Sequence, residues 1–485
     1  MGNSLTKPKS TNGAFGTHAI VIGASMAGML AARVLSETFT HVTVLERDVI
    51  PGGLVGRPGV PQARHLHALL PKGRRILEEF FPGVTLEFEA AGAEILDVAN
   101  DIAWLTPQGW GVRFASDLEA VTSTRDLLDW VVRKRLLRVP NVEILEGCIV
   151  KGLLGNTKKV DGASVSFRSE EKTNESTDVL KADFVVVATG RNSSVSRWLT
   201  ELGLPEPETT RLDAHVGYAS RMFRRPQRYH ANWRSVFVQA APPAAKRAGI
   251  LFPVEGGRWL VTLQGGGRDY PPTDDAGFLE FARSLRSPIL YEAIKHAQSL
   301  TPISNYRATE NRLWHYEQME VWPDRLAVLG DAVCAFNPVY GQGMTTAALA
   351  ALELRTCLRQ SNADYQGVSR HFQQRLAKIN RSPWMLATSE DLRFECAEGG
   401  SPGLGASLMH MYLDRVLRAA THSTSVRTRF LEVHGMLKGP ANIFRPSVLF
   451  EVLNLAFCRN SMPVPQNPLS SGAIAREAPI EREFV

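Results

Sequence analysis

The first part of the chain alternates between apolar runs of strand length and a segment with helical spacing. Residues 18–22 and 41–45 are short, mostly apolar runs, and residues 26–38 between them repeat their apolar positions at the period of a helix. A glycine-containing turn joins the first run to that helix. The pattern predicts a strand, a tight turn, a helix and a second strand, which together begin an α/β fold.

The same alternation continues to about residue 203. Residues 124–138 are amphipathic and predict a helix. Apolar runs that predict strands follow it at 142–146, 150–154, 163–168 and 183–188, and the polar stretch 169–177 predicts a hairpin tip.

From about Leu204 the predicted strands become short and closely spaced. Turn residues separate them, and EGGR at 255–258 is the clearest hairpin. The expected strands are 216–223, 235–240, 250–254 and 258–263. We expect an antiparallel sheet that forms a second domain and is closed by a helix at 274–285.

The last third is mostly helical in pattern, up to about Arg459. It opens with an apolar strand at 326–329 and a helix at 346–358. Between them, residues 330–345 (GDAVCAFNPVYGQGMT) hold three glycines, an aspartate and a proline. Because glycine weakens both neighbouring elements, a role other than folding propensity is expected for this stretch.

The composition is that of an ordinary globular protein. Its 485 residues are 44% hydrophobic and 21% charged, with a formal net charge of only +6. The densest basic run, at 133–138, has no aromatic-interleaved stripe beside it, so no nucleic-acid partner is expected. The five cysteines are scattered and contain no CxxC pair, which favours reduced thiols and a cytoplasmic location.

Both ends of the chain are polar and rich in turn residues, and predict a disordered leader at 1–16 and a disordered tail at 460–485. The leader also fits a loose acylation pattern through Gly2 and Thr6. We expect neither a transmembrane helix nor a secretory signal. For the apolar segment 447–457, core packing is favoured over peripheral contact with a membrane.

Gly23, Ser25 and Gly28 lie in the spacing G-x-S-x-x-G between the first strand and its helix. Small residues there let the backbone approach a pyrophosphate, and the helix N-terminus offers unpaired N–H groups to the anion. Glu46 ends the second strand, where an acidic side chain accepts hydrogen bonds from ribose hydroxyls. The combination predicts an adenine dinucleotide site.

The stretch 330–345 indicates which dinucleotide. A second strand–Gly-Asp–helix element, distant in the chain, suits FAD, because its ribityl chain and isoalloxazine ring need support from another segment. Asp331 can hydrogen-bond a ribityl hydroxyl, while Gly341 and Gly343 let backbone N–H groups and the next helix face the flavin ring. The predicted cofactor is therefore FAD.

Together these motifs resemble those of the flavin monooxygenases related to p-hydroxybenzoate hydroxylase and squalene epoxidase. More closely, the chain resembles the bacterial flavin epoxidases of polyether biosynthesis, such as the lasalocid and monensin epoxidases. The resemblance implies a Rossmann-like, glutathione-reductase-like FAD-binding domain with an inserted antiparallel β-sheet substrate domain and a helical C-terminal region. It rests on 19–46, 59–70, 124–130, 188–205, 257–263 and 329–344.

The resemblance implies a division of the chain and a set of site residues. Residues 17–203 and 301–360 would form the two parts of the FAD-binding domain, 204–300 the substrate domain and 361–459 the helical region. Pro338 would line the flavin ring with Gly341, Gly343 and Met344. The expected cofactor-binding residues are Gly23, Ser25, Met26, Ala27, Gly28, Glu46, Arg47, Arg64, Arg125, Asp331, Gly341, Gly343 and Met344.

Other residues are candidates for the same site. His65 and His67 suggest a metal pair, but no third ligand lies at a suitable spacing, so no metal is expected and a place near the flavin or a structural role is preferred. Arg191 is a possible phosphate contact, and Cys334 is expected to be a buried small residue. Phe237, Phe252 and Trp259 favour an apolar substrate pocket, although core packing is the simpler role for each one.

The activity that the resemblance implies is a monooxygenase that inserts one oxygen atom from O2 through a flavin C4a-hydroperoxide. Epoxidation of an alkene in a polyene or terpenoid natural-product intermediate is preferred, with aromatic or aliphatic hydroxylation second. An isoprenoid reductase and a non-catalytic flavoprotein remain alternatives, and a halogenase is disfavoured because W-x-W-x-I-P is absent. Thr189-Gly190 stands where relatives that use NAD(P)H carry Asp-Gly, which favours a separate flavin reductase over direct NAD(P)H use.

Overall fold

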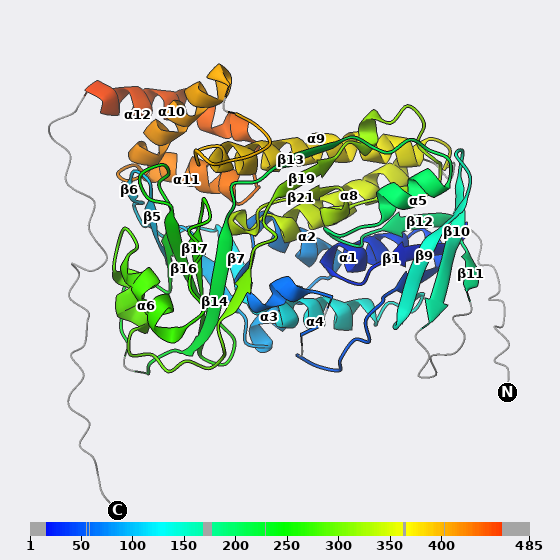
Figure 1. The fold of residues 1–485 in the computed structure, drawn as a ribbon, viewed down its shortest axis with the longest axis horizontal. Helices are drawn as coiled ribbons and strands as arrows, with labels where there is room; N and C mark the ends of the chain where they lie inside the picture. Colours follow the sequence, from blue (N-terminus) through cyan, green and yellow to red (C-terminus); the bar gives the residue numbers. More distant parts are fainter. Residues whose placement is uncertain are drawn as a thin grey trace, which may run out of the picture.

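The structure is a computed structural model that describes residues 16–54, 56–57, 59–167, 177–227, 229–361, 365–401 and 403–457. The predicted leader up to residue 15, the tail, Gly2 and most of the hairpin tip at 169–177 lie outside these residues. Two sheet-based halves lie side by side, and a group of C-terminal helices covers one end (Figure 1).

One half is built on a five-stranded sheet in the order β20–β12–β1–β2–β8. Every neighbouring pair is parallel, so both faces need helices. Strands β12 and β20 are apolar and buried throughout, and β1 and β2 are buried over their last four residues. The predicted strand–turn–helix–strand unit is confirmed as β1, α1 and β2. The strands are β1 Gly16–Ile22, β2 Phe39–Leu45, β8 Val142–Leu145, β12 Phe184–Val187 and β20 Leu326–Val328.

Helices pack against one another beside this sheet. Helix α1 (Met26–Leu35) contacts both α4 (Arg125–Leu136) and α8 (Gly343–Gln360), although α8 comes from a distant part of the chain. Thr124 caps α4 by accepting a hydrogen bond from the backbone N–H of Leu127. The packing of α8 on α1 brings the second glycine-rich segment beside the first (Figure 1).

The other half is built on a seven-stranded sheet in the order β18–β14–β17–β16–β15–β5–β6. The EGGR hairpin is confirmed, because β16 and β17 pair antiparallel up to Val254 and Arg258. The predicted antiparallel pairing is found for every other neighbouring pair of this sheet, but β15 pairs with β5 in parallel, which was not expected. The strands are β5 Ile102–Thr106, β6 Gly109–Trp110, β14 Gly217–Arg224, β15 Ser235–Val238, β16 Arg247–Val254, β17 Arg258–Gly265 and β18 Ser304–Tyr306.

Local sequence does not predict the parallel pair. A parallel partner cannot come from a hairpin, so β5 reaches this sheet from a distant segment that carries no strong strand signal. Helices α6 (Asp275–Arg283) and α7 (Ile289–Ile294) cover the face opposite the first half. They bury the side chains of alternate strand positions, including Val236, Leu251 and Val261.

Smaller sheets and helices complete both halves. Several of them were not predicted, notably the sheet β3–β7–β4 and helices α2 and α3. The small sheets contain β3 His67–Leu69, β4 Glu94–Asp97 and β7 Glu119–Ser123; β9 Cys148–Gly155, β10 Val160–Phe167 and β11 Asp178–Lys181; and β13 Thr209–Leu212, β19 Asn311–Trp314 and β21 Cys334–Ala335. The helices are α2 Pro71–Phe80, α3 Val84–Ala90 and α5 Val195–Glu201.

The helical C-terminal third is confirmed over the described residues. It consists of α9 Val368–Asp391, α10 Leu404–Ala419, α11 Thr424–His434 and α12 Pro446–Phe457. Helix α12 buries Val448 and Val452 but leaves Leu449, Phe450 and Leu453 exposed, so its apolar sequence is only partly explained by core packing. Within the described ranges, no helix is long and apolar enough to cross a membrane.

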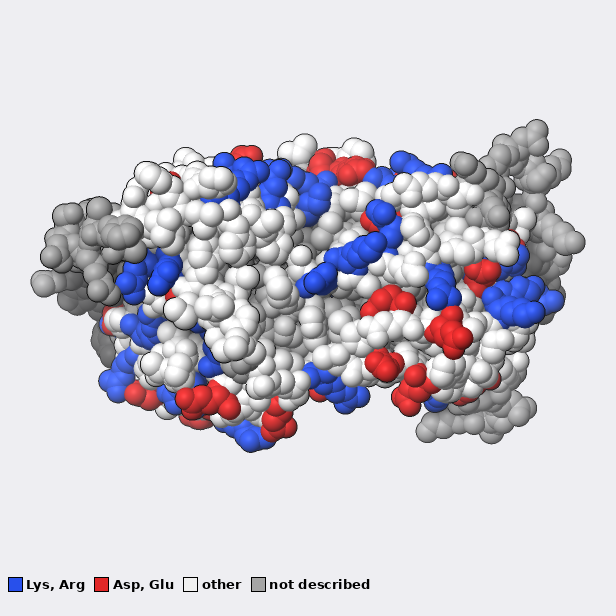
Figure 2. All heavy atoms as spheres, turned by 90° about the horizontal axis from the view of Figure 1, so that it is seen from above, with Lys and Arg blue, Asp and Glu red and all other residues white. Residues whose placement is uncertain are grey.

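Charged side chains of both signs are distributed over the face that Figure 2 shows, with wide uncharged areas between them. The four cysteines of the described ranges are unpaired, and Cys334 is buried, as predicted.

The turn between β1 and α1 depends on two glycines. Gly23 has φ +105, a backbone conformation that disfavours a side chain, and its N–H donates to the carbonyl oxygen of Leu45 at 2.8 Å. A Cβ atom on Gly28 would collide with the carbonyl oxygen of Gly23. Gly28 is therefore needed for close packing of the helix on the strand, whether or not a ligand is bound.

We predict that Gly28→Ala lowers the free energy of unfolding by about 2 kcal/mol or more, because the added methyl group overpacks this turn. Gly52→Ala is the matched control, since Gly52 is exposed and a Cβ atom added there would meet nothing within 4 Å, and we expect a change within about 0.5 kcal/mol. Urea unfolding monitored by circular dichroism measures both. Equal effects of the two substitutions would contradict the packing role of Gly28.

Candidate functional site

A cavity of about 750 Å³ lies where the two halves meet. The carboxyl ends of β1, β2 and β12 open onto it, as is usual for ligand sites of parallel sheets. Both glycine-rich segments line it, and so do side chains of the seven-stranded sheet. The structure thus brings together segments that are far apart in the sequence.

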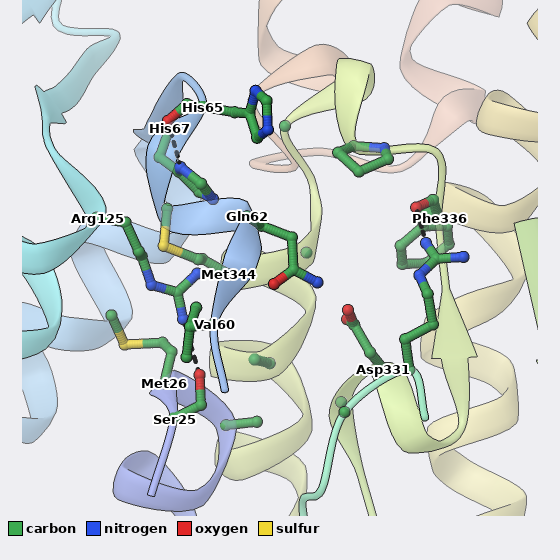
Figure 3. Close-up of a pocket in the computed structure, with 18 of the residues that line it drawn as sticks. Ser25, Met26, Val60, Gln62, His65, His67, Arg125, Asp331, Phe336 and Met344 are labelled. Carbon is green, nitrogen blue, oxygen red and sulfur yellow. Dashed lines mark hydrogen bonds between the residues drawn. The ribbon is translucent and has the colours of Figure 1, made fainter. Parts of the chain in front are cut away.

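One end of the cavity is formed by the N-terminus of α1. Gly23, Ser25, Met26 and Ala27 line it, whereas Gly28 lies beneath the turn. Ser25 is the N-cap residue but its side chain does not cap the helix. Instead its hydroxyl oxygen accepts a hydrogen bond from Arg125 at 3.0 Å (Figure 3). The first-turn N–H groups and Arg125 together make this end suited to an anion.

Arg125 is held by buried charges that extend away from the cavity. Its Nε donates to Asp129 at 2.8 Å, and Asp129 also pairs with Arg57 at 3.4 Å. Arg57 in turn pairs with Glu46 at 3.3 Å, and the Arg57 side chain is only 5% exposed. Sequence reasoning missed Arg57 and Asp129, although a lone arginine in the glycine- and proline-rich loop at 56–62 was a usable signal.

Glu46 lines the cavity, but both of its carboxylate oxygens already have partners. One accepts from the backbone N–H of Ala24 at 2.9 Å and the other from that of Asp48 at 3.0 Å. Glu46 therefore fixes the β1–α1 turn, and a contact with ribose would be a second role. Arg47 lines the cavity from its rim, with a side chain that is 63% exposed.

Arg64 and Trp259 do not line the cavity. Arg64 is exposed at the end of a short 3₁₀ helix, whereas the three residues that follow it line the cavity. Trp259 packs edge-to-face on Tyr229 in the core beneath the sheet, so the prediction that it lines a substrate pocket is wrong. Alternation along β17 explains this, because Thr262 faces the cavity from the opposite side of the strand.

Phe237 and Phe252 do line the cavity, on the side of the seven-stranded sheet. Trp104 from β5 packs against Phe237, with ring centroids 5.2 Å apart. Sequence reasoning did not single out Trp104, because β5 was not predicted. This part of the cavity wall is mainly apolar; its members also include Val98, Ile102, Ile250 and Leu431.

Asp331 extends into the cavity from the second glycine-rich segment (Figure 3). Burial raises the pKa of its carboxyl group, while the nearby Arg191 and Arg125 act in the opposite direction. It makes no hydrogen bond to the described residues, so its oxygens are available to a ligand. Gly341 has φ +66. Gly343 begins α8, and a Cβ atom added there would contact only the carboxylate of Asp331, at 3.8 Å.

The predicted lining residues Pro338, Gly341, Gly343 and Met344 all border the cavity. Arg191 borders it too, and its guanidinium donates to the carbonyl oxygens of Glu310 at 2.5 Å and Phe336 at 2.7 Å. Arg191 thereby ties the β12 end to the segment that follows Asp331.

A buried polar cluster holds the segment 337–340 from behind. Asp391, which ends α9 and is 1% exposed, accepts hydrogen bonds from Asn337 at 3.1 Å and from the hydroxyl of Tyr340 at 2.7 Å. Asn311 donates to its other oxygen at 2.5 Å, and Tyr218 donates to Asn337. Burial raises the pKa of Asp391 to about 7. No motif in the sequence indicated this cluster, because its members come from four separate segments.

His65, just before β3, and His67, the first residue of β3, are neutral near pH 7. Burial, with a smaller contribution from Arg64, lowers the pKa of His65 to about 4, and burial with Arg125 lowers the pKa of His67 to about 3. His65 contacts the hydroxyl of Ser220 at 2.7 Å, and His67 donates to the carbonyl oxygen of His65 at 2.9 Å. Both border the cavity.

Solved structures with the same fold include flavin-dependent enzymes. The flavin-dependent brominase Bmp2 superposes with a TM-score of 0.64 and 12% identity, over 92% of this chain and 100% of that one. p-Nitrophenol 4-monooxygenase PnpA from Pseudomonas putida DLL-E4 gives 0.60 and 18%, over 87% and 99%. PqsL from Pseudomonas aeruginosa, a probable FAD-dependent monooxygenase, gives 0.60 and 16%, over 78% and 97%. The chain therefore has the fold of the flavin-dependent monooxygenases.

The sequence comparison defines the family. The chain is 32% identical over 386 residues to protein Rv3254 of Mycobacterium tuberculosis (strain ATCC 25618 / H37Rv), which is 78% of this chain and 81% of that protein. It belongs to the same family as Rv3254. No protein-family model matches the chain.

We predict that Asp391→Asn changes the pH dependence of stability. The raised pKa means that Asp391 favours the folded state while protonated, so its contribution is present at low pH and is lost as pH rises through about 7. Between about pH 4 and 7 this one carboxyl group should lower the free energy of unfolding by roughly 1 kcal/mol per pH unit.

Urea unfolding over this pH range, on wild type and variant, measures the slope. Asp391→Asn should lose this component whatever its absolute stability, and Asp117→Asn, an exposed carboxylate outside the cavity, should keep it. An unchanged slope in Asp391→Asn would refute the assignment of the titrating group.

Proposed function

We propose that the chain is an FAD-dependent monooxygenase whose cofactor and substrate share the cavity between the two halves. The observation that supports this most directly is that two distant segments, Gly23–Ala27 and Asp331–Met344, line the same cavity. Apolar side chains line another part of that cavity. A nicotinamide enzyme needs only the first segment, whereas the second gives a long dinucleotide a further set of contacts.

The residues present fit FAD. The free N–H groups at the start of α1, with Arg125, would hold the pyrophosphate. The unpartnered carboxylate of Asp331 would accept hydrogen bonds from ribityl hydroxyls, and the N-terminus of α8 after Gly341 would face the ring. Glu46 and Arg47 remain our candidates for the adenosine side.

When bound and reduced, FAD supplies the activation of O2. The chain itself binds, orients and dehydrates the reactants. The neutral imidazoles of His65 and His67 add no charge to the cavity, and Pro338 borders it beside the expected ring position.

We further propose that the substrate is an apolar molecule and that an alkene carbon receives the oxygen atom. Phe237, Phe252 and Trp104 offer a wall that suits a hydrocarbon chain or terpenoid. Epoxidation itself rests on the resemblance to the polyether epoxidases, and hydroxylation is the second candidate. We propose a separate flavin reductase as the electron donor, because Thr189 stands where relatives that use NAD(P)H carry an aspartate. The Thr189 hydroxyl donates to Ser193 at 2.6 Å.

Asp331→Ala should weaken FAD binding about 10- to 100-fold, because it removes the charged hydrogen-bond acceptor that the cofactor would use. Titration of apo-protein with FAD, followed by flavin fluorescence, measures this. Asp117→Ala is the control, since that carboxylate is 89% exposed and lies outside the cavity. Equal FAD affinities for wild type and Asp331→Ala would overturn the role given to Asp331.

The activity is tested with FAD-loaded protein, isotopically labelled O2 and a panel of alkenes and phenols. We expect one labelled oxygen atom in an alkene product, with turnover that is fast with a flavin reductase and slow with NADPH alone. Oxygenation of phenols only would replace epoxidase by hydroxylase. Saturation of the alkene without O2 would identify a reductase instead.

A further inference from the structure

Arg427 of α11 is fully buried, and none of its three guanidinium nitrogens has a hydrogen-bond partner among the described residues. Buried arginines normally pair with a carboxylate or with carbonyl oxygens. Elsewhere in this protein they do: the Arg57 guanidinium pairs with Glu46 and Asp129. Burial alone lowers the pKa of Arg427 to about 10, and no acidic group among the described residues compensates. The side chain still carries its charge at neutral pH.

The surroundings of Arg427 are aromatic. Its guanidinium carbon lies 5.1 Å from the ring centroid of Trp104 and 5.9 Å from that of Phe430. A Cβ atom on Gly111 would collide with the guanidinium, so a glycine leaves the space that the cation occupies. These contacts offset part of the desolvation but supply no counter-charge.

Arg427 is adjacent to the apolar end of the cavity. It lies one turn before Leu431 and two turns before His434 on one face of α11, and both of those residues line the cavity. Trp104, which Arg427 contacts, lines it as well. The pKa of His434 is lowered to about 4 by burial and by Arg427, so His434 is neutral and can donate a hydrogen bond into the cavity.

An uncompensated buried charge costs stability, and replacement by an apolar side chain of similar size is often neutral or stabilising. A residue that lowers the stability of the fold is expected mainly at functional positions. Because apolar and aromatic side chains surround this end of the cavity, water screens the charge only weakly, and a cation behind the aromatic wall attracts an anion strongly.

We propose that the α11 end of the cavity receives the anionic head of the substrate and that Arg427 provides its counter-charge. The substrate is then an apolar carboxylic acid, held with its carboxylate near His434 and Trp104 and its hydrocarbon part along Phe237 and Phe252. This specificity rests on the proposed function, since it assigns the substrate of the same cavity.

The test compares geranate with its neutral counterpart methyl geranate. Isothermal titration of FAD-loaded wild-type protein should give at least about tenfold tighter binding of geranate. Arg427→Met, which keeps the length of the side chain without its charge, should abolish that preference while methyl geranate binds as before. Arg427→Lys should retain part of it. Arg429→Met is the control, since Arg429 lies on the same helix but pairs with Glu432, and it should leave the preference unchanged.

Equal binding of the two probes by wild-type protein would overturn the proposal, and so would a preference that persists in Arg427→Met. The wild-type comparison stands even where a variant does not fold. Urea unfolding should show Arg427→Met to be at least as stable as wild type, as is usual when an apolar side chain of similar size replaces a buried charge. The titration needs no turnover, so a failure of oxygenation is separable from a failure of this specificity.

Discussion

The parallel pairing of β1 with β2 on one side and β12 on the other is the constraint on which the rest of the structure depends. Parallel strands end at the same edge, so the turn after β1, the acid after β2 and the loop after β12 meet there. Parallel pairing also requires helices as crossovers, and the packing of α8 on α1 places Asp331 at that same edge. The cavity is thus a consequence of strand direction.

Buried charge is used in two ways around this cavity. Arg57 and Arg125 are paired with Glu46 and Asp129, and these pairs fix the side chains that shape one end. In such pairs the mutual attraction offsets part of the desolvation cost, and the hydrogen bonds fix the orientation of the side chains. At the opposite end Arg427 has no partner within the described chain. The contrast separates the charges that hold the site in shape from the one for which we propose an anionic ligand as partner.

The two glycine-rich segments are held differently. The β1–α1 turn is fixed by backbone hydrogen bonds and by Glu46, so its geometry follows from local sequence. The segment 337–340 is held by side chains of Asp391, Asn311 and Tyr218, which come from other elements. Because burial raises the pKa of Asp391 to about 7, the side-chain support of this second segment depends on pH near neutrality.

The sequence by itself determined the elements with strong periodicity: the β1–α1–β2 unit, the β16–β17 hairpin and helix α4, together with Gly23, Ser25, Arg125 and Asp331 as cavity residues. Local spacing encodes these because apolar period and turn chemistry act within a few residues. Only the tertiary structure decided that β5 joins β15 in parallel, that Trp259 faces the core, and that Asp391 and Arg427 stand behind the cavity. These features depend on contacts between distant segments and on which face of a strand is covered. Neither can be predicted from the spacing of residues within a short segment.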